Sequence, residues 1–536
     1  MLIQNERDIG LMSHNWMHTI DPGNEETPML PQPHPHDAET LDPEDWDGLR
    51  ALAHRMIDDS LDRMQRVRQD GAWKRTPEPI RESFRAALPR EGLGAEAAYR
   101  AFQEQAAPYP LGSAHPRFWG WVAGSGTPGA ALAELLTSTL HSSGAGFDCA
   151  ATLAEEQVVD WLRQMLGFPE GTSGMLPSSC SMATLSGLTI ARHVKSGYDV
   201  ARLGLHGAPK APVLYASSET HSSVRRAVEL LGLGSDALRL IPVDAERRIR
   251  VDRLEAEIAK HRMAGYAPLA VIGNAGTVNT GAVDDLEALA DVCAQEDLWL
   301  HVDGAFGAAA WLSEEARPVL KGMQRADSLA FDLHKWLQMP FSIGCCLVRS
   351  QEEALATFGD RASYLAPMRG GPRGYPRWFG NEGPELTRPA RAIKVWMSLI
   401  EHGSERFGRV VEKNIAQARY LEERVRGHER LELLGTGPLS VVCFRYVHPG
   451  LDDQALDAVN DELLLRLQED GVAVPSHTVL DGRFALRVAI TNHRTRQKDL
   501  DVLVEHVLTF GDELARSAAD ETDTRSGRSA QEGIEA

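Results

Sequence analysis

LWLHVDGAF (298–306) and ADSLAFDLHKWL (326–337) each place a run of apolar residues directly before a polar side chain. Short apolar runs bounded by Gly or turn residues are typical of buried strands. The first run ends in Asp303, and Lys335 follows the second. In a parallel sheet the carboxyl ends of the strands share one edge, and ligands bind there. We therefore expect Asp303 and Lys335 to lie close together.

Further short strands alternate with amphipathic helices on either side of these two stretches. The strand-like runs are VLYAS (213–217), LRLIPV (238–243), LAVIGNAG (269–276) and IGCCLVRS (343–350). Such alternation predicts an α/β fold in which helices cover both faces of a mostly parallel sheet. His221 and Thr277 follow two of these strands, so we expect them at the same edge as Asp303 and Lys335.

The periodicity divides the chain into a large domain with smaller parts around it. Residues 119–399 hold the predicted sheet, and 38–118 read as a helical N-terminal segment. From residue 400 to 515 two strands among longer helices predict a small α+β C-terminal domain. Both ends, 1–37 and 516–536, are polar and lack periodicity, which predicts disordered tails.

Composition excludes several classes of protein. The 536 residues are 43% hydrophobic and 25% charged, as in an ordinary globular protein, and their net charge of −20 disfavours nucleic-acid and anionic-membrane partners. No apolar run approaches the roughly 20 residues that cross a bilayer, and the N-terminus does not resemble a signal peptide. The six cysteines lack C-x-x-C spacing and read as reduced thiols of a cytoplasmic protein.

Lys335 has apolar neighbours on both sides in Asp-Leu-His-Lys-Trp. Burial lowers the pKa of a lysine, and the neutral amine is a nucleophile suited to Schiff-base chemistry. A lone lysine at a strand end more often extends its amine to solvent. The prediction of a reactive amine therefore depends on the whole group of polar residues at the sheet edge.

Asp303 is either the cap of a following helix or the partner of a buried cation. With Lys335 nearby, the second interpretation is a carboxylate that keeps a pyridine nitrogen protonated. Ala305 would then present a small methyl group to one face of the ring, and His221 would stack on the other. The alternative for His221 is an ordinary position at the start of a helix.

Ser179, Cys180 and Ser181 precede the helical run MATLSGLTIARHV. Small hydroxyl residues at a helix start are usually plain caps. The same arrangement also binds phosphate, because backbone N–H groups and hydroxyls point toward the anion. Thr277, with its neighbour Gly276, could contribute to such a site.

A metal site is the competing interpretation of this edge. His301 and Asp303 have the spacing of an iron facial triad. Residues two apart on any strand share a face, however, and the α/β alternation does not suit the all-β folds of such oxygenases. We therefore expect no metal.

The chain resembles the group II amino-acid decarboxylases, enzymes of fold type I that use pyridoxal 5′-phosphate (PLP) and include the aromatic-L-amino-acid, histidine and glutamate decarboxylases. The similarity spans roughly residues 40 to 515. The matching pieces, in the order of the family, are HPRFWGW (115–121), DWLRQMLGFP (160–169), SSCSMATL (178–185), ETHSSVRRA (219–227), WLHVDGAFG (299–307), ADSLAFDLHKWL (326–337) and ELTRPARAIKVW (385–396).

The resemblance implies a role for each matching residue. Lys335 corresponds to the lysine that forms the Schiff base, Asp303 to the partner of the pyridinium nitrogen, and Tyr364 to a tyrosine on the mobile catalytic loop. The remaining matches are Ala305 and His221 on the two ring faces, Ser179, Cys180, Ser181 and His334 near the phosphate, and Thr277 as a further cofactor contact.

The implied activity is decarboxylation of an L-amino acid to the amine and CO2, with aromatic substrates slightly favoured by HPRFWGW. Met182, Leu153 and Leu333 depart from the common family pattern and leave the substrate open. Oxidative deamination to an aldehyde and transamination are the alternatives on the same scaffold. A catalytically silent binding protein is disfavoured because Lys335 and Asp303 are intact.

The resemblance also implies a homodimer with its active site at the subunit interface. In this family the N-terminal helices embrace the partner subunit. Here their apolar face would contain Leu49, Leu52, Met56 and Leu61.

Overall fold

The computed structural model describes residues 39–359 and 368–532, so the predicted N-terminal tail lies outside the described residues. Residues up to Arg55 form one compact unit and those from Met56 onward form a second. Described by itself, the first unit contains a short polar turn and the beginning of helix α1 (Trp46–Arg66). Among the described helices, none has the length and apolar character needed to span a membrane.

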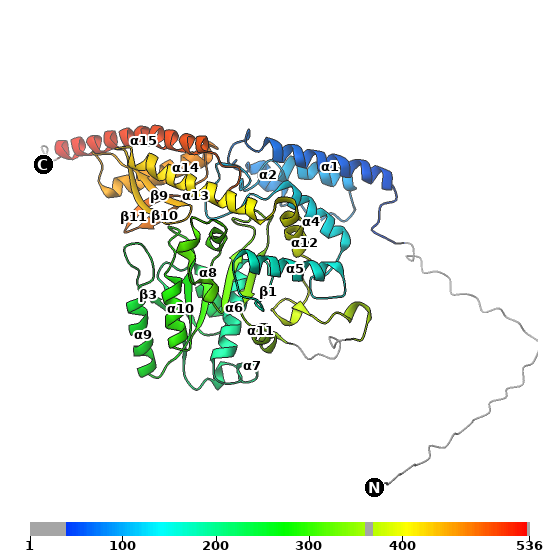
Figure 1. Ribbon diagram of the computed structural model, residues 1–536. Coiled ribbons are helices and arrows are strands. Elements are labelled where there is room, and N and C mark those ends of the chain that lie inside the picture. The colour runs from blue at the N-terminus through cyan, green and yellow to red at the C-terminus, as the bar shows by residue number, and fades with distance from the viewer. Residues whose placement is uncertain (1–38, 360–367, 533–536) are drawn as a thin grey trace, which may run out of the picture. The chain divides into compact units, whose positions relative to one another are not determined.

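A seven-stranded sheet with helices packed around it is the centre of the second unit (Figure 1). Its strands have the order β1-β7-β6-β5-β4-β2-β3. Strands β3, β2, β4, β5 and β6 are parallel, while β7 runs antiparallel to both of its neighbours. This confirms the predicted α/β fold with a mostly parallel sheet. The strands are β1 (Ser173–Met175), β2 (Pro212–Ser217), β3 (Leu238–Ile241), β4 (Ala267–Asn274), β5 (Trp299–Asp303), β6 (Ser328–Asp332) and β7 (Gly344–Val348).

Both faces of this sheet are buried, which explains why its strands read as continuous apolar runs. On β2, Val213 and Tyr215 belong to one hydrophobic core, whereas Leu214 and Ala216 belong to another. The first core includes residues of helices α5 (Ala150–Met165), α9 (Val251–Met263) and α10 (Leu286–Gln295). The second includes residues of α6 (Cys180–Lys195), α8 (Ser222–Leu230) and α11 (Gln351–Phe358).

A separate four-stranded antiparallel sheet, with the order β10-β11-β9-β8, lies entirely within residues 400–515. The larger sheet lies within 119–399, and the division at residue 400 into a large and a small domain stays a prediction. The elements of the smaller part are α13 (Ser404–Arg426), β8 (Leu431–Thr436), β9 (Val441–Tyr446), α14 (Asp453–Glu469), β10 (Ser476–Leu480), β11 (Arg483–Ala489) and α15 (Gln497–Glu532).

Helix α15 continues to Glu532, whereas the sequence predicts a disordered tail from residue 516. A helix whose first turns are packed into a core needs no new nucleation to extend, and no proline interrupts residues 516–532. The remaining helices are α2 (Glu78–Ser83), α3 (Ala95–Ala101), α4 (Pro128–Leu140), α7 (Val200–Leu203) and α12 (Ala392–His402), with short single turns between elements.

Candidate active site

Four of the predicted site residues follow four strands that are direct neighbours in the sheet. Asp303 is the last residue of β5, and Lys335 comes three residues after the end of β6. His221 and Thr277 follow β2 and β4 at a similar distance. Because β6, β5, β4 and β2 are adjacent and parallel, the structure brings these residues to one edge of the sheet.

The amine of Lys335 is paired with a carboxylate that sequence reasoning missed. Its Nζ lies 2.9 Å from Oδ2 of Asp332, and its side chain is 21% exposed. The other oxygen of Asp332 accepts a 2.5 Å hydrogen bond from the backbone N–H of Cys180 at the start of α6. The spacing Asp-Leu-His-Lys was the available signal, since it sets a carboxylate three residues before the amine.

This ion pair overturns the expectation that Lys335 has a lowered pKa. Burial is the largest single effect and lowers the pKa of the amine. The charge of Asp332, its hydrogen bond to the amine and other nearby negative charges together outweigh burial, so the pKa of Lys335 lies above its ordinary value. Asp303 contributes in the same direction from a greater distance. Without a bound ligand, the amine is therefore held in its charged form.

Asp303 is a buried carboxylate without a cationic partner within 4 Å among the described residues. It is 5% exposed, and its Oδ1 accepts the N–H of Ala305 at 3.0 Å and faces Sγ of Cys180 at 3.6 Å. Burial and the charge of Asp303 raise the pKa of the Cys180 thiol, so this thiol stays neutral. The second oxygen of Asp303 has no donor in the described chain, and a buried carboxylate in this condition fits a cationic ring N–H.

His221 stands directly before α8, and its ring nitrogens have different roles. Nδ1 accepts the backbone N–H of Ser223 at 3.1 Å, so the proton of the neutral ring is on Nε2. Partial burial lowers the pKa of His221, which favours this neutral form, and the ring interacts electrostatically with Asp303 and Lys335. The imidazole is thus a neutral donor beside the two charged groups.

The start of α6 has the groups that a phosphate requires. Ser179 is the residue directly before the helix, and its hydroxyl accepts no hydrogen bond from the N–H groups of the first turn. The hydroxyls of Ser179 and Ser181 have no hydrogen-bond partner within the described part of the chain, and Ser181 is exposed. Gly344 passes so closely that a Cβ there would lie 2.4 Å from the carbonyl carbon of Ser179. Donors at an open helix start fit the phosphate of PLP.

The other predicted residues differ in how the structure uses them. His334 is buried, its Nδ1 lies 2.8 Å from the carbonyl oxygen of Ile343, and burial lowers its pKa. The hydroxyl of Thr277 accepts the N–H of Ala282 at 3.1 Å, so it bonds within its own turn. Ala305 is partly buried beside Asp303, and Tyr364 lies outside the described residues.

Among the described residues no group of three His, Cys, Asp or Glu side chains gathers, and the two residues of the metal interpretation have other contacts. His301 is fully buried, with Nδ1 2.8 Å from Oγ of Ser328 and Nε2 3.4 Å from Oγ1 of Thr184. Burial lowers its pKa to about 4. One ring nitrogen therefore connects β5 with β6, and the other connects the sheet with α6.

Arg487 is a further buried group that sequence reasoning missed. It is 3% exposed, and its Nη1 donates to the carbonyl oxygen of Trp121 at 2.7 Å. Its Nη2 has no hydrogen-bond partner in the described chain. Trp121 has a φ of 52° and a 60% exposed side chain, and Gly124, three residues later, donates its N–H to the carbonyl of His334 at 3.0 Å. The segment 121–124 thus connects Arg487 with the lysine-bearing turn.

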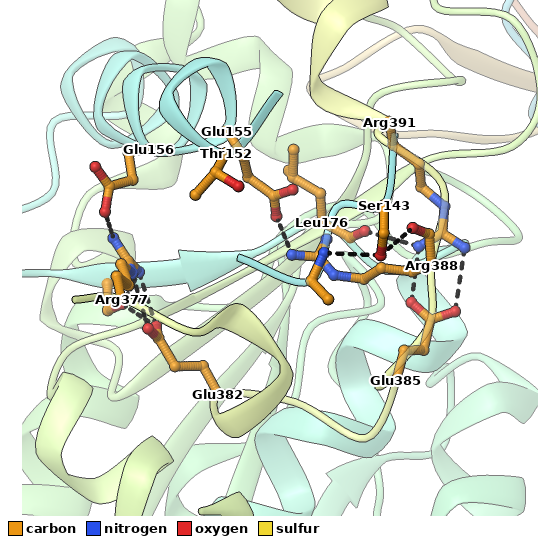
Figure 2. A network of polar contacts seen from close by, with 12 residues as sticks. Ser143, Thr152, Glu155, Glu156, Leu176, Arg377, Glu382, Glu385, Arg388 and Arg391 are labelled. Atoms are coloured by element: carbon orange, nitrogen blue, oxygen red, sulfur yellow. Dashed lines mark hydrogen bonds and ion pairs between the residues drawn. The ribbon is translucent and has the colours of Figure 1, made fainter. Parts of the chain in front are cut away.

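Ion pairs and hydrogen bonds within residues 377–391 connect this segment with α5 and with the end of β1 (Figure 2). Arg388 lies 2.6 Å from Glu155 of α5, and both side chains are almost fully buried. Arg391 pairs with Glu385 at 2.7 Å and donates to the carbonyl of Leu176 at 3.0 Å. Arg377 pairs with Glu382 at 2.7 Å. Leu176 follows β1 and comes three residues before Ser179, so the network also supports the start of α6.

Comparisons with known proteins agree with this geometry. Residues 77–447 match the family model described as the pyridoxal-dependent decarboxylase conserved domain. An aromatic-L-amino-acid decarboxylase of Bacillus atrophaeus is 34% identical over 410 residues, which are 75% of this chain and 82% of that protein. An L-2,4-diaminobutyrate decarboxylase of Rhizobium meliloti is 31% identical over 76% of this chain and 80% of its own length.

Solved structures give the same result. The crystal structure of Oryza sativa TDC with PLP and tryptamine has a TM-score of 0.82 and 26% identity, and covers 89% of this chain and 100% of that one. Mouse CSAD has a TM-score of 0.81 and 26% identity, and covers 87% of this chain and 99% of that one.

The buried pair of Glu155 and Arg388 generates a stability prediction. Arg388→Met leaves the Glu155 carboxylate buried and unpaired, so the free energy of unfolding should fall by about 3–5 kcal/mol. Arg409→Met is the control, because Arg409 and Glu405 form a surface pair with side chains 64% and 92% exposed. It should change the same quantity by less than about 1 kcal/mol. Equal effects in denaturant unfolding would contradict the structural role of the buried pair.

The close approach of Gly344 generates a second prediction. In Gly344→Ala, the new methyl group would meet backbone atoms of Ser179 and Cys180 at 2.4 and 2.8 Å, so the start of α6 must move. We expect PLP affinity to fall by on the order of tenfold, the loss of one charge-assisted hydrogen bond. Fluorescence titration of apoenzyme with PLP measures it. Gly92→Ala is the control because no atom lies within 4 Å of its Cβ position, and a similar loss there would refute the assignment.

Proposed function

Because the chain belongs to the pyridoxal-dependent decarboxylase family, we propose that it converts an aromatic L-amino acid to the amine and CO2. Membership makes it a carboxy-lyase with PLP as its cofactor. The observation that carries the proposal is the amine of Lys335 between the carboxylates of Asp332 and Asp303, beside the open start of α6. When bound, PLP supplies the electron sink for the bond that breaks.

In this proposal, the residues at the sheet edge each bind a different part of PLP. Lys335 would bind its aldehyde carbon covalently, and the second oxygen of Asp303 would hold the ring N–H. Ala305 and His221 would contact the two ring faces. The phosphate would be bound at the start of α6 by the hydroxyls of Ser179 and Ser181, beside Cys180, whose own N–H is donated to Asp332. Thr277 and His334 would lie nearby.

Asp332 would move the proton that Lys335 must lose. A charged amine is not a nucleophile, so the proton has to leave Nζ before the amine reacts. Oδ2 of Asp332 accepts it across 2.9 Å, while Oδ1 stays fixed by the N–H of Cys180. The same carboxylate can return the proton when the amine of the substrate replaces that of the lysine.

Two residues are candidates for donating the proton that replaces the lost carboxylate at Cα. His221 presents an N–H at Nε2 in its neutral form. Tyr364 is a phenol, which is protonated at neutral pH because its ordinary pKa is about 10. We propose Tyr364 as the donor and His221 as the group that holds the ring in place.

The preference for aromatic substrates is supported by exposed rings beside the site. Phe341 is 54% exposed, and its ring centroid lies 4.8 Å from that of His334. Trp121 is 60% exposed, and its backbone is held by Arg487. Such rings favour a planar side chain. The unpartnered Nη2 of Arg487 would face the carboxylate of the amino acid.

Product analysis with a panel of L-amino acids tests the activity. We expect CO2 and amine in equal amounts, with kcat/KM at least about tenfold higher for tryptophan, tyrosine or phenylalanine than for glutamate or 2,4-diaminobutyrate. Lys335→Ala should abolish turnover. Ammonia and peroxide in place of the amine would instead establish an oxidative deaminase, and a preference for acidic or basic substrates would refute the aromatic assignment.

We further propose that the enzyme is a homodimer, and helix α4 provides the support. Its leucines at 132, 135, 136 and 140 follow helical spacing and are 37–61% exposed, which makes an apolar stripe on one helix. Of the apolar residues expected on α1, Leu52 is buried and Leu61 is 37% exposed.

The free thiols of all six cysteines support a reducing compartment such as the cytoplasm.

The oligomeric state can be tested on this stripe. Leu136→Asp would bury an unpaired carboxylate at the interface, so the dimer dissociation constant should rise at least about tenfold. Leu230→Asp on α8 is the control, because this leucine is 68% exposed on another helix. Sedimentation velocity at several concentrations separates the cases. A monomeric parent enzyme, or equal effects of both variants, would refute the proposed interface.

A further inference from the structure

A partly open cavity of about 520 Å³ lies away from the sheet edge, where α1, α13 and the segment before α15 meet. All of its lining residues belong to the unit that begins at Met56. They come from four stretches of the chain that are far apart in sequence. The lining residues are Met64, Gln65, Val67, Arg68, Pro116, Lys413, Gln417, His493, Arg494, Thr495 and Arg496.

The cavity carries a concentrated positive charge. Arg68, Lys413, Arg494 and Arg496 line it, and no carboxylate does. The nearest compensation is Asp499, which lies behind the wall and pairs with Arg68 at 2.6 Å. The other three cations, Lys413, Arg494 and Arg496, have no carboxylate partner within 4 Å among the described residues. In a chain with a net charge of −20, this is a local reversal of the overall charge.

Backbone carbonyls hold two of these cations in place and leave donors unused. Nζ of Lys413 donates to the carbonyl of His493 at 2.6 Å. Nη1 of Arg494 donates to the carbonyls of Ser125 and Gly126, each at 3.2 Å. The guanidinium of Arg496 is exposed and has no side-chain partner within the described residues. The cations are thus fixed around the cavity with hydrogen-bond capacity to spare.

The cations also destabilise one another. Burial, together with the charges of Arg496 and Arg68, lowers the pKa of Lys413. Burial lowers the pKa of Arg494 as well, and it lowers the pKa of His493 to about 4, so that ring is neutral. An anion in the cavity would relieve this repulsion, because opposite charge favours the charged form of each group.

We propose that this cavity binds a compact polyanion that carries phosphate groups. Arginine forks and a lysine amine match phosphate oxygens in geometry and charge, and the volume is in the range of small-ligand sites. The site is distinct from the phosphate site at α6 and does not depend on the proposed activity. Ser125, whose carbonyl accepts a hydrogen bond from the lining residue Arg494, also donates its hydroxyl to Oε1 of Gln338 at 3.1 Å. Gln338 comes three residues after Lys335.

Calorimetric titration of the PLP-saturated holoenzyme with pyrophosphate tests the proposal. Saturating PLP keeps the α6 site filled, and sodium chloride keeps the ionic strength constant, so general screening does not contribute. We expect saturable binding of one pyrophosphate per chain. Citrate, titrated in parallel, distinguishes a polycarboxylate from a phosphate ligand and should bind more weakly.

Variants of the lining cations localise the binding. Arg496→Gln and Lys413→Gln should each weaken pyrophosphate binding on the order of tenfold, the effect of one charge-assisted contact. Lys413→Arg should retain binding within about threefold. Lys498→Gln is the matched control, because it removes one positive charge from the same segment but does not line the cavity. The absorbance of bound PLP verifies that every variant is folded.

Several outcomes would overturn the proposal. These are the absence of saturable binding to the holoenzyme, a loss in Lys498→Gln as large as in Arg496→Gln, or tighter binding of citrate than of pyrophosphate. If no amino acid of the panel were decarboxylated, this test would be unaffected, because the titration needs no turnover. The two proposals therefore fail separately.

Discussion

The ion pair between Lys335 and Asp332 is the contact on which the arrangement of the site depends. One oxygen of Asp332 holds the amine, and the other accepts the first N–H of α6. A single carboxylate thereby ties the lysine-bearing turn after β6 to the helix start that would bind phosphate. Together with other nearby negative charges, among them Asp303, it outweighs the effect of burial, so the pKa of the lysine lies above its ordinary value.

Asp303, the second carboxylate of the site, differs from Asp332 in its hydrogen bonding, and this difference indicates separate roles. Asp332 is satisfied by groups of the protein, whereas one oxygen of Asp303 has no donor among the described residues. A buried carboxylate left in this state is costly unless a ligand supplies the partner. The protein therefore prepares one carboxylate for its own lysine and leaves the other for the cofactor ring.

Close packing at two glycines holds the elements around the site in this arrangement. Gly344 lets β7 approach the backbone of Ser179, and Gly187 lets α6 approach the imidazole of His301, where a Cβ would lie 2.9 Å from Nδ1. The segment around Ser125 contacts the turn after Lys335 through Gln338, and its carbonyls also hold Arg494, which lines the cationic cavity. The site and the cavity thus share one stretch of backbone, although their ligands would be different.

The sequence by itself determined the α/β fold, the family and the sheet edge that gathers Asp303, Lys335 and His221. These features are local: apolar runs mark the buried strands, and the residue after each run is fixed at the carboxyl end by chain connectivity. Only the tertiary structure decided that Asp332 is the partner of Lys335 and that Thr277 bonds within its own turn. It alone brought Arg68, Lys413 and Arg494 around one cavity. The physical reason is that pairing, burial and pKa depend on distances between segments far apart in the chain, and no spacing along the sequence encodes those distances.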